Sequence, residues 1–116
     1  MQIERNLGFE PEDVELKKVG YDVESRVPGT GRLRFIEVKG RMAQADHFTV
    51  TKNEILTALN KPEDFVLAIV EFLNEHEHRV HYVREPFARS GITMDFNGAS
   101  VNFPLAEMIA RGSFPS

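Results

Sequence analysis

The amino-acid sequence predicts an α/β domain in which helices flank a mixed β-sheet. Segments with apolar residues at helical spacing are interleaved with segments of alternating or continuous apolar residues, in the order α-β-β-(β)-α-β-β-α. Interleaved helices and strands of this kind are typical of α/β and α+β proteins. The length of 116 residues suits one compact domain, so we expect residues 1–116 to form a single unit.

The first expected element is a helix over Gln2–Leu7, which Gly8 would end. The segment that follows, up to Lys18, is charged and has only scattered apolar side chains. A domain that begins in the last turn of a helix is what a segment cut from a larger protein would show. We therefore expect this domain to belong to a longer chain.

A β-hairpin is expected next, with strands over Gly20–Val27 and Arg32–Lys39. The sequence Pro-Gly-Thr-Gly at positions 28–31 is a strong turn signal between them. A two-residue loop and a four-residue loop at this turn give the same pairing of the strands. In that register Asp22 lies directly opposite Glu37.

After a polar loop over residues 40–46, His47–Val50 is expected to form a short strand. A capping box then predicts the start of a helix, because Thr51 can cap the free amides and Glu54 can reach back to it. Apolar residues at helical spacing follow, and the helix is expected to end after Asn60, just before a proline.

The run Phe65–Phe72 is rich in β-branched and aromatic residues, which indicates a buried interior strand. A polar link leads to a further expected strand over Arg79–Arg84. Pro104 is expected to open the last helix, and Gly112 to end it.

Composition excludes several classes of protein. The chain has no cysteine, which excludes disulfide scaffolds, thiolate zinc sites and cysteine nucleophiles. Its longest apolar run is far shorter than the roughly 20 residues of a membrane helix, so we expect no membrane partner. A basic segment followed by an apolar one is missing at the start, so we expect a cytoplasmic protein.

The charge of the chain is acidic overall and basic in one segment. Fourteen Lys and Arg against eighteen Asp and Glu give a net charge of −4, which argues against strong non-specific binding of nucleic acid. Residues 26–41, however, carry five cations and one acid. A polyanion that binds this protein is expected to meet that segment. The alternative is a solvated strand pair with ordinary surface arginines.

Side chains alternate between the two faces of a strand, so the predicted register sorts the hairpin residues into two sets. One face carries the charged side chains of Asp22, Glu24, Glu37 and Lys39. The other face carries the apolar side chains of Tyr21, Val23, Ile36 and Val38. We expect the apolar face to pack on a core and the charged face to open toward a cleft.

This pattern indicates a metal site. Opposed residues have Cβ atoms about 4.5–5.5 Å apart, and two carboxylates at that distance are destabilising without a cation. Lys39 supplies one charge, and Mg²⁺ or Mn²⁺ would supply two with an all-oxygen shell. Such an ion lowers the pKa of bound water, and Lys39 would orient that water or stabilise charge on a phosphate. Gly20, opposite Lys39, would leave room for a substrate. The alternative is a surface hairpin whose exposed ion pairs contribute little.

Three strings of the sequence resemble a known family. They are Gly-Tyr-Asp-Val-Glu-Ser at 20–25, Arg-Phe-Ile-Glu-Val-Lys-Gly-Arg at 34–41 and Thr-x-Asn-Glu at 51–54. Together they resemble the NO VEIN C-terminal domains, which occur near the C-terminal end of helicase-like ATPases. The pattern is also similar to the PD-(D/E)xK, or restriction-endonuclease-like, superfamily.

The resemblance implies a restriction-endonuclease-like mixed sheet flanked by helices, with the active-site residues on adjacent strands. It places the metal-binding acids at Asp22 and Glu37, the further backbone ligand at the carbonyl of Val38, and the catalytic lysine at Lys39. An acid on the preceding helix often assists in that superfamily, which makes Glu4 the candidate auxiliary acid. A solvated residue at the end of a helix is the alternative for Glu4.

Three other residues could contact the backbone of a nucleic acid. Lys52 and Asn53 lie at a predicted helix N-terminus, where free amides and a cation suit a phosphate. Arg41 follows the lysine strand and could reach the same backbone. Ordinary capping-turn and solvated residues are the alternative for all three.

The functional expectation is a Mg²⁺-dependent nuclease, or a nuclease-derived DNA-processing module, attached to a helicase-like ATPase. The expected reaction is phosphodiester hydrolysis by metal-activated water, with DNA and the ATPase region of the same parent chain as partners. The alternative is a non-catalytic accessory domain that binds DNA or a partner protein.

Overall fold

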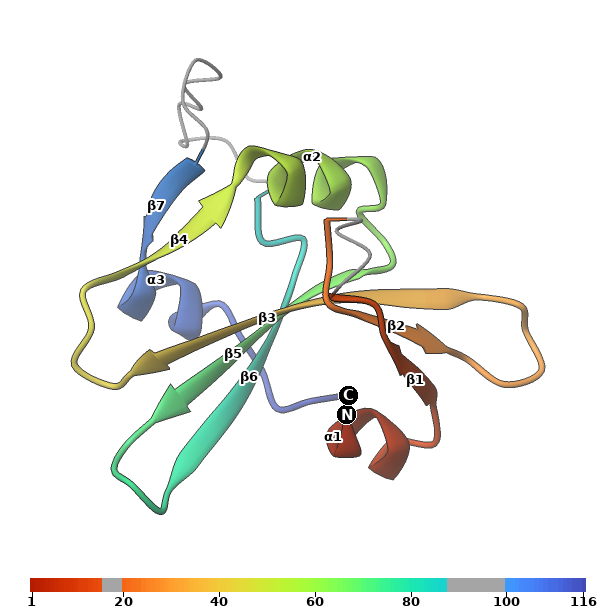
Figure 1. Cartoon of the computed structure of the whole chain (residues 1–116), viewed down its shortest axis with the longest axis horizontal. Coiled ribbons are helices and arrows are strands. Elements are labelled where there is room, and N and C mark those ends of the chain that lie inside the picture. Colours follow the sequence, from red (N-terminus) through yellow and green to blue (C-terminus); the bar gives the residue numbers. More distant parts are fainter. Residues whose placement is uncertain (16–19, 88–99) are drawn as a thin grey trace.

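The computed structural model describes residues 1–15, 20–87 and 100–116, and within these it shows a mixed α/β fold (Figure 1). In the described residues the main sheet has five strands in the order β1-β2-β3-β5-β6. These strands are β1 (Glu10–Asp13), β2 (Val23–Arg26), β3 (Leu33–Met42), β5 (Phe65–Phe72) and β6 (His78–Arg84). Strands β3 and β5 are parallel and their other neighbours are antiparallel, so the sheet is mixed, as the sequence predicts.

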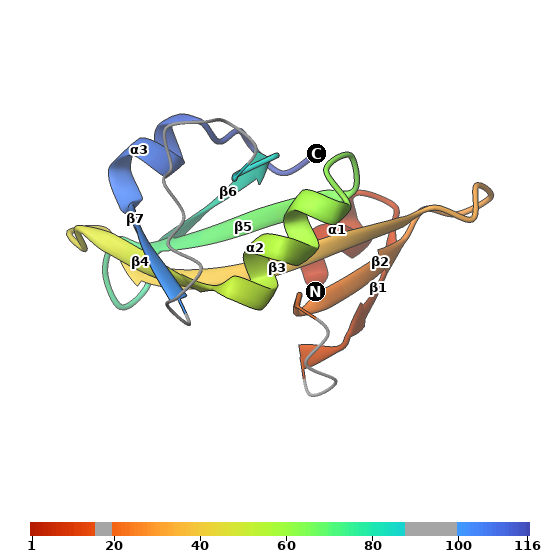
Figure 2. The ribbon, with the colours of Figure 1, turned by 90° about the horizontal axis from the view of Figure 1, so that it is seen from above.

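A small antiparallel sheet and short helices pack on the main sheet. The small sheet pairs β4 (His47–Thr51) with β7 (Ser100–Pro104). The helices of the described residues are α1 (Gln2–Asn6), α2 (Lys52–Asn60) and α3 (Leu105–Ala110). Helix α2 lies across one face of the sheet near β3 (Figure 2). None of the helices in this described part is long and apolar enough to cross a membrane.

Both faces of the main sheet are covered by apolar side chains. The larger core cluster lies on the α2 side and includes Phe35, Ile55, Leu67 and Phe103. The smaller cluster lies on the other face and consists of Val23, Ile36, Val66, Ala68 and Tyr82, with Ile3 of α1 packed against it. Successive residues of β3 therefore point alternately into the two clusters.

The predicted hairpin register is confirmed over residues 23–26 and 33–36, but the predicted pair of Asp22 and Glu37 is not formed, because the ladder ends at Val23 and Ile36. Val23 pairs with Ile36 and Glu24 pairs with Phe35. At the turn, Gly29 and Gly31 have φ angles of +80° and +72°, which other residues adopt only with strain. The glycines of the turn thus permit the tight reversal that sets the register.

The predicted boundaries are wrong by three residues at two strands, and β1 and β7 were not predicted at all. Strand β2 starts at Val23 rather than at Gly20. Strand β3 does not end at Lys39 but continues to Met42, because it stays paired with β5 up to Phe72. The predicted loop over residues 40–46 therefore starts only after Met42. Strand β1 has the sequence Glu-Pro-Glu-Asp, which shows no apolar alternation and is recognisable only by its backbone pairing with β2.

The predicted capping box of α2 is present in both halves. The Thr51 hydroxyl accepts from the Glu54 amide at 3.2 Å, and the Glu54 carboxylate accepts from the Thr51 amide at 2.8 Å. Helix α2 follows β4 and leads through a short turn into β5, which is parallel to β3. This crossover places the first turn of α2 beside the middle of β3.

Candidate functional site

The candidate site lies where β2 and β3 separate. Their pairing ends at Val23 and Ile36, and the amide of Asp22 also donates to the Ile36 carbonyl, at 2.9 Å. Asp22 and Val23 thus both face Ile36, as at a β-bulge. A bulge changes the direction in which the side chains next to it point. The Asp22 carboxylate then accepts from the amide of Val38 at 2.8 Å. The Asp22 side chain thus accepts the hydrogen bond that a backbone carbonyl of β2 would accept if the ladder continued to Val38.

The bulge overturns the predicted position of Tyr21. The sequence places Tyr21 on the face of Val23 and Ile36, but its ring packs edge-on against Phe35, with ring centroids 4.8 Å apart. Its hydroxyl donates to Glu24 at 3.1 Å on that same side of the sheet. Val23 and Ile36 face a core as expected, and Asp22 and Glu37 line a pocket. The expectation that the charged face is open is wrong in part, because that face also carries Phe35 and supports the larger core.

The structure brings the three predicted catalytic residues together. Asp22 and Glu37 line one pocket of about 200 Å³. Other residues that line it are Glu15, Gly20, Tyr21, Asn53 and Glu54. Lys39 lies on the same face of β3 as Glu37, and its Nζ atom is 3.4 Å from the Glu37 carboxylate. Two acids and a lysine thus meet at the end of the β2–β3 ladder.

Glu54 is a site residue that the sequence interpretation missed. Both of its carboxylate oxygens contact Lys39 Nζ, at 3.1 and 3.3 Å. The capping box correctly predicts its bond to Thr51, and that role alone was assigned to it. Nothing in the sequence shows that the first turn of α2 packs beside Lys39, so only the fold reveals the second role.

The electrostatics of the site centre on Glu37, which is only 3% exposed. Burial raises the pKa of Glu37 to about 9, and its hydrogen bond to Glu54 and the negative charges of Glu54 and Asp22 add to this, while Lys39 opposes it. Burial also disfavours the Glu54 carboxylate, but hydrogen bonds with Glu37, Thr51 and Lys39 lower its pKa below the usual value. At neutral pH, Glu37 therefore keeps a proton and shares it in a hydrogen bond with Glu54.

Gly20 does not leave room for a substrate, which corrects the expectation for this residue. It is buried with a φ of +93°, and a Cβ atom there would collide with the Thr57 hydroxyl of α2. The amide nitrogen of Asn53 would be 3.3 Å away. Gly20 therefore allows the chain before Asp22 to pack closely against α2.

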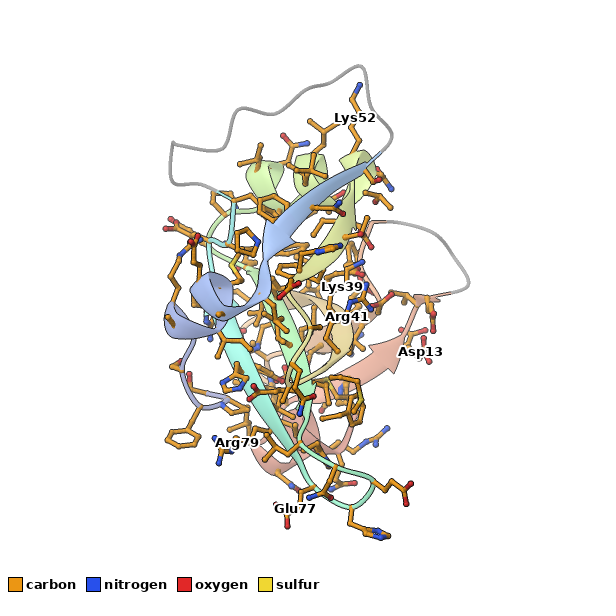
Figure 3. The ribbon with its side chains drawn as sticks, turned by 90° about the vertical axis from the view of Figure 1, so that its left-hand side faces the viewer. Asp13, Lys39, Arg41, Lys52, Glu77 and Arg79 are labelled. Atoms are coloured by element: carbon orange, nitrogen blue, oxygen red, sulfur yellow. The ribbon has the colours of Figure 1, made fainter. Side chains whose placement is uncertain are left out.

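The predicted nucleic-acid contacts are spread over the surface rather than gathered at the pocket. Asn53 lines the pocket, whereas Lys52 lies apart at the start of α2 (Figure 3). Arg41 belongs to β3 and not to a loop, and it lies close to Lys39 in the same view (Figure 3). Its guanidinium donates to the carbonyl of Gly40 at 2.9 Å.

Glu4 lies on the opposite face of the sheet and is not brought to the pocket. It is fully buried, so its interpretation as a solvated residue is wrong. Its carboxylate accepts hydrogen bonds from Arg34 Nη2 at 3.3 Å and from the hydroxyl of Tyr82 at 2.7 Å, and it lies 3.0 Å from Arg34 Nε in an ion pair. Arg34 precedes Glu37 by three residues on β3, so the two side chains point to opposite faces.

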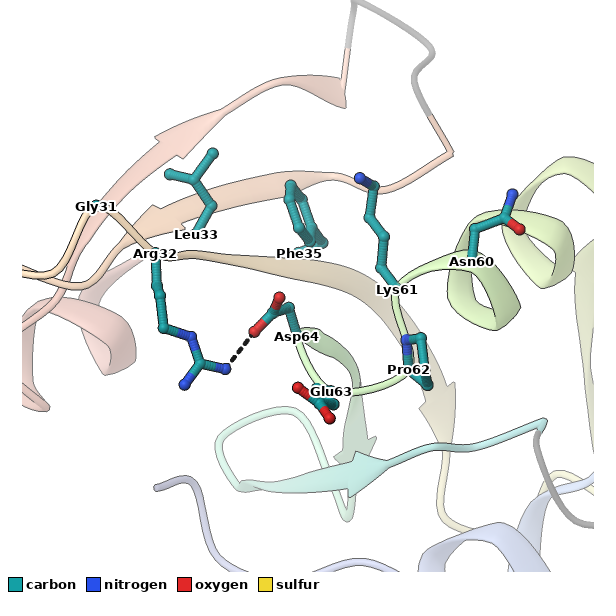
Figure 4. Close-up of a pocket in the computed structure, with 9 residues that line it drawn as sticks. All are labelled: Gly31, Arg32, Leu33, Phe35, Asn60, Lys61, Pro62, Glu63 and Asp64. Atoms are coloured by element: carbon teal, nitrogen blue, oxygen red, sulfur yellow. Dashed lines mark hydrogen bonds and ion pairs between the residues drawn. The ribbon is translucent and has the colours of Figure 1, made fainter.

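A larger pocket of about 540 Å³ lies between the start of β3 and the turn after α2 (Figure 4). Its charges balance within the pocket, because Arg32 and Lys61 line it together with Glu63 and Asp64, and Arg32 pairs with Asp64. None of the three predicted catalytic residues lines it. We therefore place the candidate site in the smaller pocket.

The donor atoms of the smaller pocket fit a hard divalent cation. In the described residues, no group of three or more His, Cys, Asp or Glu side chains could hold a metal. Mg²⁺, however, is often bound through only one or two carboxylates, with water and substrate phosphate completing its shell. Asp22 and Glu37 would supply those carboxylates, and Glu37 would release its proton as the cation binds. The carbonyl of Val38 lies on the same edge of β3 as its amide, which faces Asp22, and is suited to be a third ligand.

Comparison with known proteins identifies a family. The family model described as Protein NO VEIN, C-terminal, matches residues 1–83. That range is more than half of the chain and includes every residue of the candidate site. No curated protein matches the sequence.

Proposed function

Since this chain belongs to the family of NO VEIN C-terminal domains, we propose that it is a Mg²⁺-dependent, nuclease-like module that acts on the phosphodiester backbone of DNA. One observation supports this above the others. Asp22 and Glu37 come from two neighbouring segments and line one pocket, Lys39 contacts Glu37, and an amide of β3 donates to Asp22. Two carboxylates and a lysine so placed suit a metal-assisted attack of water on phosphorus.

Each residue has a distinct task in the proposed hydrolysis. Asp22, Glu37 and the Val38 carbonyl would hold the cation. Bound Mg²⁺ supplies positive charge that makes water more acidic and neutralises phosphate oxygens. Lys39 would orient the attacking water or stabilise the charge that builds on the phosphate as the P–O bond breaks. Water adds across that bond, so the reaction needs no further co-reactant.

The fold is compatible with a relation to the PD-(D/E)xK superfamily, which we include in the proposal. Asp22 directly precedes β2, and Glu37 and Lys39 lie in the middle of the adjacent β3, in a mixed sheet with helices on both faces. Arg41, Lys52 and Asn53 are the proposed contacts to the DNA backbone. We propose further that the domain works in the cytoplasm beside a helicase-like ATPase region of the same parent chain.

The second candidate function is a non-catalytic accessory domain that binds DNA or a partner protein. The contacts of the site favour it, because Lys39 pairs with Glu54 and the protonated Glu37 carries no charge that a cation would have to balance. The net charge of −4 also disfavours tight DNA binding. Binding of DNA that weakens steeply with salt, without Mg²⁺-dependent cleavage, would support this alternative.

Asp22→Asn is the sharpest test of the proposed metal site. The asparagine oxygen can still accept from the Val38 amide, so the end of the ladder is kept while the negative charge is lost. Millimolar Mn²⁺ or Mg²⁺ is expected to raise the melting temperature of the parent protein, as ligands of the native state do. The variant is expected to lose most of that shift and to cleave labelled DNA at a strongly reduced rate.

Glu24→Gln is the matched control, because Glu24 lies on β2 near Asp22 but does not line the pocket. It is expected to keep the metal-induced shift. The metal site would be contradicted if neither metal raised the melting temperature of the parent protein. It would also be contradicted if both metals raised the melting temperature of Asp22→Asn as much as that of the parent.

A further inference from the structure

We propose that Glu54 is a positioning residue that holds Lys39 beside Glu37 and so makes the site depend on the first turn of α2. The inference deepens the proposed function and rests on it, because Lys39 acts on phosphate only if that function is correct. Its structural part, the placement of Lys39 by Glu54, can be tested without any measurement of cleavage.

The contacts of Glu54 join three parts of the site. One carboxylate oxygen accepts from the Thr51 amide at 2.8 Å, which fixes the side chain to the start of α2. The two oxygens lie 3.1 and 3.3 Å from Lys39 Nζ, closer than the 3.4 Å that separates this atom from Glu37. Glu54 also shares a hydrogen bond with Glu37. The carboxylate of Glu54 is therefore closer to Lys39 Nζ than that of Glu37 is, and Glu54 links Lys39 to the buried Glu37.

The helix cap alone does not explain a carboxylate at this position. A glutamine completes a capping box as well as a glutamate does, because only an oxygen acceptor is needed. The negative charge is what pairs with Lys39, whose side chain and that of Glu54 are 16% and 14% exposed. Ion pairs that are shielded from water to this extent restrain a lysine more strongly than surface pairs do.

Helix α2 also contacts the segment that contains Asp22. Gly20, two residues before Asp22, packs against Thr57 of α2 with no space for a Cβ atom. The helix thus contacts the segment that leads into Asp22 and, through Glu54, the lysine that follows Glu37. Displacement of α2 would move Lys39 and the approach to Asp22 together.

Glu54→Gln tests the inference, because it keeps the acceptor for the cap and removes the charge that pairs with Lys39. The rate at which an N-hydroxysuccinimide ester labels the Lys39 amine, read by mass spectrometry, reports how firmly that side chain is held. We expect this rate to rise by roughly fivefold in the variant, the factor that a modest ion pair represents. The exposed Lys61, which contacts Phe35 far from Glu54, serves as the reference amine.

Leu56→Gly is the matched control, since Leu56 is 39% exposed on α2 and glycine weakens the helix without altering the cap or Lys39. It is expected to lower the melting temperature and to leave Lys39 labelling unchanged. In cleavage assays with Mg²⁺, Glu54→Gln is expected to lower kcat by about tenfold with little change in KM, because an interaction that orients a reacting group is lost.

The outcomes separate the two proposals. Equal Lys39 labelling in the parent and in Glu54→Gln, or the same increase in Leu56→Gly, would overturn the positioning role. Selective labelling in Glu54→Gln supports that role even if the parent protein cleaves nothing, and the failure to cleave would then count against the proposed function alone. A Glu54→Gln variant that cleaves with the parent's kcat would show that the site works without this placement.

Discussion

Replacing Glu37 by Gln is expected to abolish the loss of stability that the parent protein shows as the pH rises from 6 to 9. The folded protein keeps a proton on Glu37 up to a pKa of about 9, whereas the unfolded chain releases it near the usual value of 4.5. Unfolding between these values therefore releases a proton, and raising the pH favours the unfolded state. The free energy of unfolding should fall by up to about 1.4 kcal/mol per pH unit across this window.

Glutamine has the shape of a protonated glutamate and cannot ionise, so Glu37→Gln keeps the hydrogen bond to Glu54 at every pH. Urea unfolding at pH 6, 7, 8 and 9 should give a variant whose stability does not fall as that of the parent does. The difference in stability between the variant and the parent should widen by about 2–3 kcal/mol between pH 6 and pH 8, the linkage of one proton over two pH units. The difference between the two proteins isolates the contribution of Glu37 from that of every other ionisable group.

Glu77→Gln is the control for this measurement, because Glu77 is exposed at the turn between β5 and β6, far from the pocket (Figure 3). It should have the pH dependence of the parent. A parent protein with no fall in stability up to pH 9 would show that Glu37 is ionised when folded. The same Glu37→Gln variant should show no Mg²⁺-dependent cleavage, since it leaves Asp22 as the one negatively charged ligand of the proposed site.

The parts of the fold that turn, capping and apolar patterns determine were predictable from the sequence. The turn at residues 28–31 and the alternation of β3 are sufficient to set the hairpin register, and a capping box marks the start of α2. Strand β5 was predicted with its observed bounds, because a short apolar run rich in β-branched and aromatic residues is typical of a buried strand. These elements depend on interactions between residues close in the chain.

The rest depends on contacts between distant segments. The bulge at Asp22 moves Tyr21 to the other face, and a sequence that alternates regularly gives no sign of an extra residue in the ladder. Glu54 reaches Lys39 only because the crossover places α2 beside β3. Strand β1 is largely charged and is held by backbone pairing with β2, which the amino-acid composition of the segment does not reveal.

The most destabilising single change we expect is Glu4→Ala, which should lower the free energy of unfolding by about 3–5 kcal/mol. Glu4 is fully buried and binds the guanidinium of Arg34, itself only 8% exposed, and the hydroxyl of Tyr82. Truncation leaves the arginine charge and the tyrosine hydroxyl without this partner inside the protein. Loss of a buried partner costs far more than loss of a surface ion pair.

Two further variants test this explanation by urea unfolding. Asn6→Ala, on the exposed side of the same helix, should change the stability by less than about 0.5 kcal/mol. Adding Arg34→Met to Glu4→Ala should recover a large part of the loss, because the unpaired charge is then removed as well. A double variant no more stable than Glu4→Ala would contradict the account and assign the loss to the packing of α1.

Glu4→Gln decides whether this residue also assists the pocket on the other face. The amide keeps an acceptor for Tyr82 and loses the charge that binds Arg34, so the variant should be destabilised but folded. Because Glu4 and Glu37 lie on opposite faces of the sheet, the melting shift caused by Mn²⁺ should be the same as in the parent. A variant that loses the shift while remaining folded would restore Glu4 as an auxiliary acid and would require α1 to move when the cation binds.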